Sequence, residues 1–233
     1  MRGHIILSAR TSQEVAELVP PSMPCSFCNR KLHQTTAHCL TSGACHAFAQ
    51  RLIQRHDEIV CEFVRFLCSR TLFKVVFKDT IIDPSIFKAG ATLEHTRPNI
   101  VAQDPSNGDT IFFDVTVVMP SRMAHAYSDK TTRYQPMGEL AEDYCSRHSS
   151  PPAGFVSMPR SCTVVPLVFS VFGDMHDSSF SWCCDAVGEL GAGENMVAPF
   201  LANSLMSIAS CASAVFVASS KLYSGSVRRR WKK

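Results

Sequence analysis

Four residues near the amino terminus are of types that bind zinc. Cys25 and Cys28 form a Cys-x2-Cys pair, which presents two thiolates at a tight turn, and His38 and Cys45 supply a second pair. Zinc accepts soft thiolates together with an imidazole in a closed tetrahedral shell, and such a site is structural. The spacing Cys-x2-Cys-x9-His-x6-Cys therefore predicts a structural zinc site.

The choice of ligands at this site stays open on spacing alone. His33, Cys39 and His46 are also within reach, and the alternative to zinc is a loop with incidental thiols and imidazoles. The other cysteines, including Cys183 and Cys184, show no ligand spacing, so we expect them to be small core or surface residues.

A second group of residues has the chemistry to act on phosphodiesters. Asn99 follows a proline, Asp114 lies in the run Thr110–Val118, and Lys130 and Tyr134 come later. Oxygen ligands on adjacent strands can share magnesium or manganese, and that ion can generate hydroxide while a lysine stabilises developing charge. On spacing alone, Asp114 also fits an edge residue and Lys130 an ordinary solvated charge.

Hydrophobic patterning predicts the elements that would position these side chains. Apolar residues from Phe48 to Leu67 recur at three- and four-residue steps, which predicts a helix with one apolar face. Segments rich in β-branched and aromatic residues predict strands at Leu72–Ile82, Pro98–Ala102, Thr110–Val118 and Cys162–Phe172. The sequence DPSNGD, at Asp104–Asp109, predicts a tight turn. Further helices are expected at Pro136–Arg147, Asp177–Leu190 and Met196–Leu222. This order predicts an α/β fold with a mixed sheet.

Composition excludes several classes of protein. Hydrophobic residues make up 45% of the chain and charged residues 18%, which excludes wholesale disorder. Eleven cysteines without a secretory signal indicate a reducing compartment and exclude a secreted disulfide scaffold. Residues 196–219 are long enough to span a bilayer, but Asn203 and several serines interrupt them, so we expect a buried or amphipathic helix and no membrane partner. The net charge of +3 is too small to predict nucleic-acid binding alone.

Five motifs follow one another along the chain in this order: CSFC…HCLTSGAC, QRHDEIV, RPN…FDVTV, DKTTRY and VVPLVFSVFG. In this order they resemble the C-terminal part of site-specific non-LTR retrotransposon reverse transcriptases, from about Pro24 to the C-terminal helix. The resemblance implies a CCHC zinc knuckle followed by a restriction-endonuclease-like domain of the PD-(D/E)xK fold, a mixed sheet flanked by helices. The organisation expected is an irregular leader at 1–23, the knuckle at 24–47, the endonuclease domain at 48–222 and a basic tail at 223–233.

The resemblance also implies an activity and a setting. Such a domain nicks target DNA so that the free 3′ end primes reverse transcription; its partners are DNA and possibly element RNA, and it acts in the nucleus. It is normally fused to a polymerase domain, but no polymerase acidic motif occurs in this chain. We therefore expect a tail fragment or a truncated product.

The resemblance also implies a role for individual residues of the candidate sites. The resemblance makes Cys25, Cys28, His38 and Cys45 the zinc ligands. It makes Asp114 the second metal-binding acid, a magnesium ligand, Lys130 the catalytic lysine and Tyr134 the aromatic residue after it. Glu58 or Glu62 on the preceding helix could add a further acid.

The chain departs from the family pattern at Asn99, where the family has aspartate. An amide brings no negative charge, and losing one charge at a two-acid site costs several kcal/mol, so we expect weak or absent cleavage. The alternative is that Asp104 or Asp109 supplies the first acid. A non-enzymatic zinc-containing nucleic-acid-binding module, or a decayed fragment of an element, is the alternative function.

Basic residues predict where nucleic acid would bind. Those near the hairpin are Arg97, Arg122, Lys130 and Arg133, and those of the tail are Arg228, Arg229 and Arg230, with Trp231 among them. Basic side chains neutralise phosphates, and an exposed tryptophan can stack on an unpaired base. A solvated terminus that binds nothing is the alternative for the tail.

Overall fold

A mixed four-stranded sheet forms the centre of the described part of the chain. The computed structural model describes residues 28, 39–40, 45–78, 98–151, 154–188 and 197–214, with the backbone alone at 136–145 and 188. The strands are β1 (Lys74–Lys78), β2 (Ile100–Gln103), β3 (Thr110–Val118) and β4 (Cys162–Ser170), in the spatial order β1-β2-β3-β4. The β1–β2 and β2–β3 pairs are antiparallel, and β4 runs parallel to β3. The predicted α/β class with a mixed sheet is confirmed.

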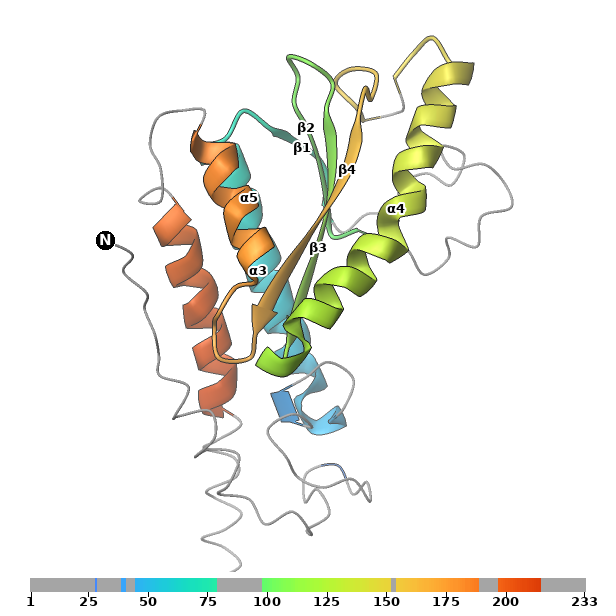
Figure 1. Cartoon of the computed structure of the whole chain (residues 1–233). Coiled ribbons are helices and arrows are strands. Elements are labelled where there is room, and N and C mark those ends of the chain that lie inside the picture. The colour runs from blue at the N-terminus through green and yellow to red at the C-terminus, as the bar shows by residue number, and fades with distance from the viewer. Residues whose placement is uncertain are drawn as a thin grey trace, which may run out of the picture.

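Helices cover both faces of this sheet (Figure 1). Helix α4 (Met123–Arg147) lies on one face and, as the crossover between β3 and β4, makes their parallel pairing possible. Helices α3 (Ala49–Arg70) and α5 (Asp177–Gly188) lie on the other face, beside a C-terminal helix, Val197–Ala214. Two short 3-10 turns, η1 (His46–Phe48) and η3 (Pro120–Arg122), precede α3 and α4.

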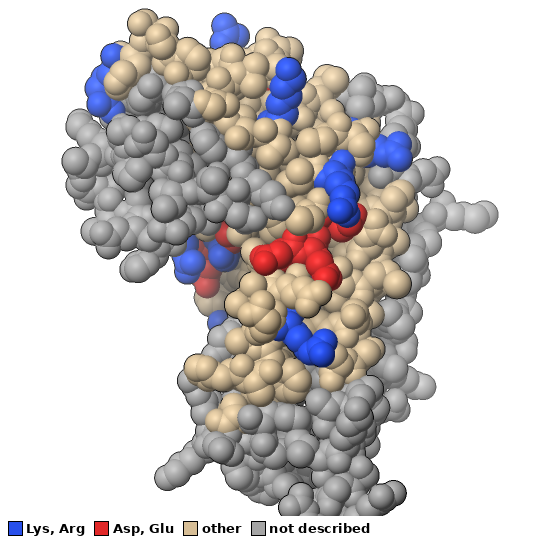
Figure 2. All heavy atoms as spheres, turned by 180° about the vertical axis from the view of Figure 1, so that it is seen from behind, with Lys and Arg blue, Asp and Glu red and all other residues tan. Residues whose placement is uncertain are grey.

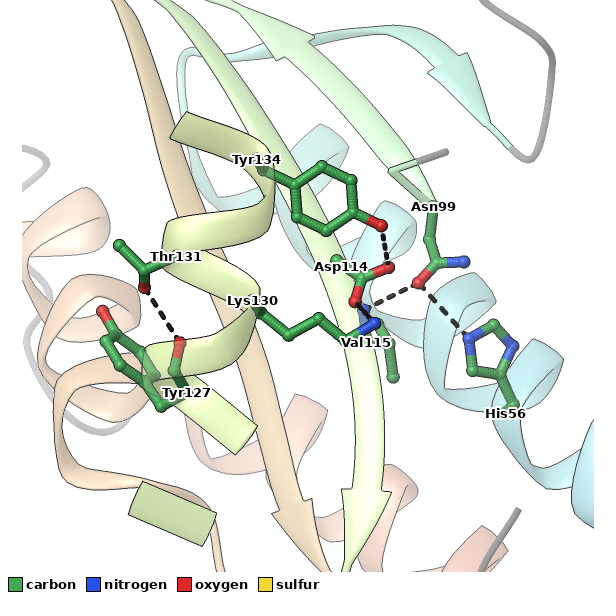
Figure 3. A network of polar contacts seen from close by, with 8 residues as sticks. All are labelled: His56, Asn99, Asp114, Val115, Tyr127, Lys130, Thr131 and Tyr134. Atoms are coloured by element: carbon green, nitrogen blue, oxygen red, sulfur yellow. Dashed lines mark hydrogen bonds and ion pairs between the residues drawn. The ribbon is translucent and has the colours of Figure 1, made fainter. Parts of the chain in front are cut away.

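Strand β3 is buried on both faces because each face meets a helix. Ile111, Phe113, Val115 and Val117 belong to the core on the α3 side. The ring of Phe113 packs edge-on against Phe63 of α3 and against Trp182 of α5, with ring centroids 4.8 Å apart in both pairs. Since side chains alternate along a strand, Asp114 points to the opposite face, toward α4 (Figure 3).

The predicted turn at DPSNGD joins β2 to β3 and is held by its own polar side chains. The carboxylate of Asp104 accepts a hydrogen bond from the backbone N–H of Ser106 at 2.8 Å, and the Asn107 amide oxygen accepts one from that of Asp109 at 2.8 Å. Gly108 adopts a φ of 83°, which glycine reaches without strain. The turn therefore fixes the register of β2 on β3 through local chemistry.

The helix start predicted at Pro136 is wrong, because α4 begins at Met123. Pro120 occupies the first turn of η3, where a missing N–H costs nothing, and the chain continues from there into α4. Pro136 lies inside the helix, and α4 changes direction midway along its length (Figure 1). Packing of α4 on β3 and β4 outweighs the local tendency of proline to begin a helix.

The C-terminal helix Val197–Ala214 packs one face on the core. Its buried residues recur at three- and four-residue steps: Val197, Phe200, Ser204, Ile208 and Cys211. The ring of Phe200 lies 5.3 Å from that of Phe63 and 5.4 Å from that of Phe66 in α3. In length and apolar composition this helix would also suffice to cross a membrane, although 28% of it is buried inside the protein. The buried stripe is the pattern expected of an amphipathic terminal helix.

Candidate functional site

Asp114 lies at the centre of a polar network between β3 and α4 (Figure 3). Its Oδ1 accepts a hydrogen bond from the Tyr134 hydroxyl at 2.9 Å, and its Oδ2 forms an ion pair with the Lys130 ammonium. Asp114 is only 4% exposed, so inside the protein its carboxylate depends on both partners. The structure thus brings together three of the residues that the sequence singled out.

The spacing of Lys130 and Tyr134 on α4 explains why both reach the same carboxylate. They are four residues apart, which places them one above the other on one helix face. The Lys130 ammonium lies 5.8 Å from the centre of the Tyr134 ring. The Lys130 side chain is 21% exposed, so it connects the buried acid to solvent, whereas Tyr134 is enclosed.

Tyr134 is a permanent hydrogen-bond donor to this site. Burial raises the pKa of its phenol above the ordinary value, and the nearby charge of Asp114 and the hydrogen bond to it raise the pKa further. The positive charge of Arg133 opposes these effects but is the smallest contribution. The hydroxyl therefore keeps its proton at neutral pH and holds Asp114 in place.

Asn99 approaches the same point from β2, through its side chain. Ile100 is paired with Phe113, so Asn99 lies across from Asp114 just beyond the last pair of the ladder. Its Oδ1 accepts a hydrogen bond from the backbone N–H of Val115 at 2.7 Å, which takes the place of a ladder hydrogen bond. Asn99 and Asp114 are therefore neighbours in the register, and the side chain of each bonds to other partners.

His56 of α3 joins the network without having been assigned a role from sequence. Its Nε2 lies 3.3 Å from the same Asn99 oxygen, and its Nδ1 lies 3.1 Å from the carboxylate of Asp57. The only signal in the sequence was its place in the motif QRHDEIV. Sequence reasoning missed the contact because 43 positions separate the two residues.

The described side chains do not match a two-carboxylate magnesium site. The Asn99 oxygen is turned toward the Val115 N–H and His56, and both Asp114 oxygens already face Tyr134 and Lys130. Magnesium favours charged oxygen ligands, and here one carboxylate stands where two are needed. Within the described ranges, no group of three His, Cys, Asp or Glu side chains is arranged to hold a metal ion.

The alternative first acids, Asp104 and Asp109, lie at the other end of the hairpin. Asp109 directly precedes β3 and is five residues from Asp114, a separation of roughly 16 Å in extended chain. Its Oδ1 accepts a hydrogen bond from the Ser161 hydroxyl at 2.6 Å, and Asp104 binds Ser106. Both carboxylates therefore stabilise the turn and do not reach Asp114.

The acids proposed from the helix, Glu58 and Glu62, lie on a different face of α3 from His56. Glu58 accepts a hydrogen bond from Gln54 at 2.8 Å, and Glu62 accepts one from Asn203 of the C-terminal helix at 2.9 Å. Both line a surface pocket between these two helices. Neither carboxylate joins Asp114 among the described contacts.

The predicted zinc site is only partly inside the described residues. Cys45 is buried at the start of η1, and Cys28 is partly buried against the same core. Cys25 and His38 lie outside the described residues. The zinc site therefore stays a prediction.

The predicted nucleic-acid contacts are also partly described. Arg122 and Arg133 are exposed on η3 and α4, whereas Arg97, Arg228, Arg229, Arg230 and Trp231 lie outside the described residues. Figure 2 shows one face of the molecule, on which acidic side chains gather at the centre and basic ones lie above, below and beside them. The described part of that face has no continuous basic stripe, so it is a poor match for a phosphate backbone.

No protein-family model matches the chain, and no curated protein matches it at a significant level. The site geometry and the sequence motifs are therefore the basis for a function.

Proposed function

We propose that the chain is a restriction-like endonuclease domain, related to those of site-specific non-LTR retrotransposon reverse transcriptases, that binds DNA and cleaves it weakly or not at all. The mixed sheet with helices on both faces supports this, since it is the architecture that the resemblance implies. The five sequence motifs support it by their order. The proposal includes a zinc knuckle before the domain and action in the nucleus.

One observation carries the proposal. Asp114, Lys130 and Tyr134 come from a strand and the following helix, and they meet at one carboxylate beside Asn99. A carboxylate next to a lysine at the open end of a β-hairpin is the arrangement that the resemblance implies for phosphodiester hydrolysis. With a second carboxylate at position 99, the two acids would hold a divalent ion and the amine would stabilise the developing charge. Impairment follows from Asn99, which brings an amide where a second carboxylate would hold the ion.

A plasmid-nicking assay tests the enzymatic part. Supercoiled DNA is incubated with magnesium or manganese and the full chain, as the natural sequence and as Asn99→Asp. We expect little nicking by the natural chain and clear nicking by Asn99→Asp, which is abolished again when Asp114→Ala is added. Gln135→Glu is the matched control, because it adds the same charge at an exposed position of α4 and should not restore nicking. If Asn99→Asp folds but does not nick, the assignment of this hairpin is wrong.

A second candidate function is a non-enzymatic nucleic-acid-binding module. The engagement of the Asn99 oxygen by the Val115 N–H favours it, because it gives the asparagine a structural role that does not need metal. Binding without nicking in both the natural chain and Asn99→Asp would support this candidate. Arg133→Gln should weaken that binding and its dependence on salt, since Arg133 is exposed beside Tyr134.

The zinc knuckle has a test of its own. Elemental analysis of the purified chain should give one zinc per molecule, and Cys25→Ser should remove it. A chain without zinc would overturn the knuckle and leave the endonuclease proposal to the nicking assay.

A further inference from the structure

Among the described polar contacts, helix α3 reaches the site through His56. We infer that His56 is a positioning residue: it donates a hydrogen bond from Nε2 to the Asn99 oxygen and so holds the side chain that completes the β2–β3 ladder beside Asp114. The inference deepens the proposed function, on which its meaning for catalysis rests. The hydrogen bonds themselves can be tested without any activity.

The backbone fixes which way the Asn99 amide points. A backbone N–H can only donate, so the Asn99 atom 2.7 Å from the Val115 nitrogen must be the oxygen and not the NH2 group. The same oxygen lies 3.3 Å from Nε2 of His56, and two acceptors cannot bond to each other. A hydrogen bond between these two atoms therefore requires the proton on Nε2.

The other ring nitrogen of His56 points to an acid. Nδ1 lies 3.1 Å from Asp57, which is the next residue and is 58% exposed, so Asp57 can accept a hydrogen bond from Nδ1 when that nitrogen is protonated too. His56 itself is 30% exposed, which leaves the ring in contact with solvent on one side. The chain of contacts thus runs from Asp57 through His56 and Asn99 to the Val115 backbone.

The position of Val115 in β3 explains why this series of contacts matters for the site. The ladder between β2 and β3 ends at the pair Ile100–Phe113, and alternate N–H groups of β3 point toward β2. Val115 is the next such group, and Asn99 satisfies it. Because Val115 directly follows Asp114, the contact fixes the backbone at the buried carboxylate, and His56 connects that point to α3.

Nuclear magnetic resonance of the 15N-labelled full chain tests the inference. The His56 ring nitrogens should show a proton on Nε2. His56→Ala should speed hydrogen exchange of the Val115 amide by roughly tenfold, the effect of losing one supporting hydrogen bond. His56→Gln should restore slow exchange, because its side-chain NH2 can donate to the same oxygen. His125→Ala is the matched control, since it removes a surface histidine paired with an aspartate, Asp129, on α4.

Three results would overturn the inference. These are an unprotonated Nε2, Val115 exchange unchanged in His56→Ala, or exchange equally fast in His56→Gln and His56→Ala. None of them depends on nicking, so a failed nicking assay with these signals intact rejects the proposed function alone. Thermal unfolding of each variant shows that the comparison is made between folded proteins.

Discussion

The Tyr134 hydroxyl donates a hydrogen bond to Oδ1 of Asp114 at 2.9 Å, and the two residues are 2% and 4% exposed. The tyrosine belongs to α4 and the acid to β3, so this hydrogen bond joins the helix to the sheet at the point where the candidate site forms. A buried carboxylate is costly unless each oxygen has a partner, so the site depends on Tyr134 for its stability.

Replacing Tyr134 with phenylalanine should destabilise the fold while keeping the ring in place. The substitution leaves Asp114 Oδ1 without its donor inside the protein, and we expect the free energy of unfolding to fall by about 1–3 kcal/mol. Urea unfolding followed by circular dichroism measures this loss. Tyr127→Phe is the control, because Tyr127 is less buried and stacks on His176 through its ring. An unchanged unfolding free energy in Tyr134→Phe would contradict the contact.

The raised pKa of Tyr134 predicts a stability that falls at alkaline pH. Its phenol holds its proton more tightly in the folded chain than in the unfolded chain, where the pKa is about 10. The contribution is fully present below that value and is lost as the pH rises toward the folded pKa. We expect the difference in unfolding free energy between the natural chain and Tyr134→Phe to shrink above about pH 10.

Ultraviolet absorbance gives a second measurement of the same effect. The chain has four tyrosines, and in the folded protein one of them should resist ionisation until the protein unfolds. The resistant signal should be missing in Tyr134→Phe. Ionisation of all four tyrosines before unfolding would reject the prediction.

The ion pair between Lys130 and Asp114 should contribute more than an ordinary surface pair. Lys130→Met leaves a buried carboxylate without its counter-charge, and we expect a loss of about 1–3 kcal/mol in unfolding free energy. The double variant Asp114→Asn/Lys130→Met should be less destabilised than the sum of the single variants, because neither unpaired charge remains.

The surface pair His125–Asp129 on the same helix is the control for that cycle. Both of its side chains are more than half exposed, so Asp129→Asn should change the unfolding free energy by less than about 1 kcal/mol. A loss in Lys130→Met no larger than that in Asp129→Asn would contradict the buried character of the site.

Arg55 should anchor the segment before α3 from inside the core. Arg55 is 2% exposed, its Nη1 donates a hydrogen bond to the backbone oxygen of Leu40 at 2.9 Å, and burial lowers the pKa of its guanidinium. Arg55→Met would leave that carbonyl without its donor, so we expect a loss of about 1–3 kcal/mol in thermal or urea unfolding. Arg51→Met on the exposed side of α3 should have little effect, and equal losses in the two variants would reject the anchor.

The elements that follow local rules were predictable from the sequence. The strand predicted at Thr110–Val118 has those bounds in the structure, and the turn at Asp104–Asp109 forms where proline, asparagine and glycine cluster. The apolar face predicted for the first helix is buried at Leu52, Ile59, Val60, Phe63 and Leu67. Each of these depends on neighbours within a few residues, which is the range over which periodicity and turn chemistry act.

Burial of polar side chains was not predictable in the same way. Arg55 is charged, so it would be expected at the surface. It is buried instead, because its guanidinium donates a hydrogen bond to the Leu40 carbonyl. The early start of α4 likewise depends on how the helix packs against β3 and β4 rather than on Pro136.

The sequence by itself determined an α/β chain with a β-hairpin that places position 99 near Asp114, because hydrophobic period and turn residues act locally. Only the tertiary structure decided that Lys130 and Tyr134 contact the two oxygens of that carboxylate, and that His56 faces the Asn99 oxygen. These contacts join a helix to a strand across long stretches of sequence. They form because buried polar groups require hydrogen-bond partners, and only the folded chain brings those partners together.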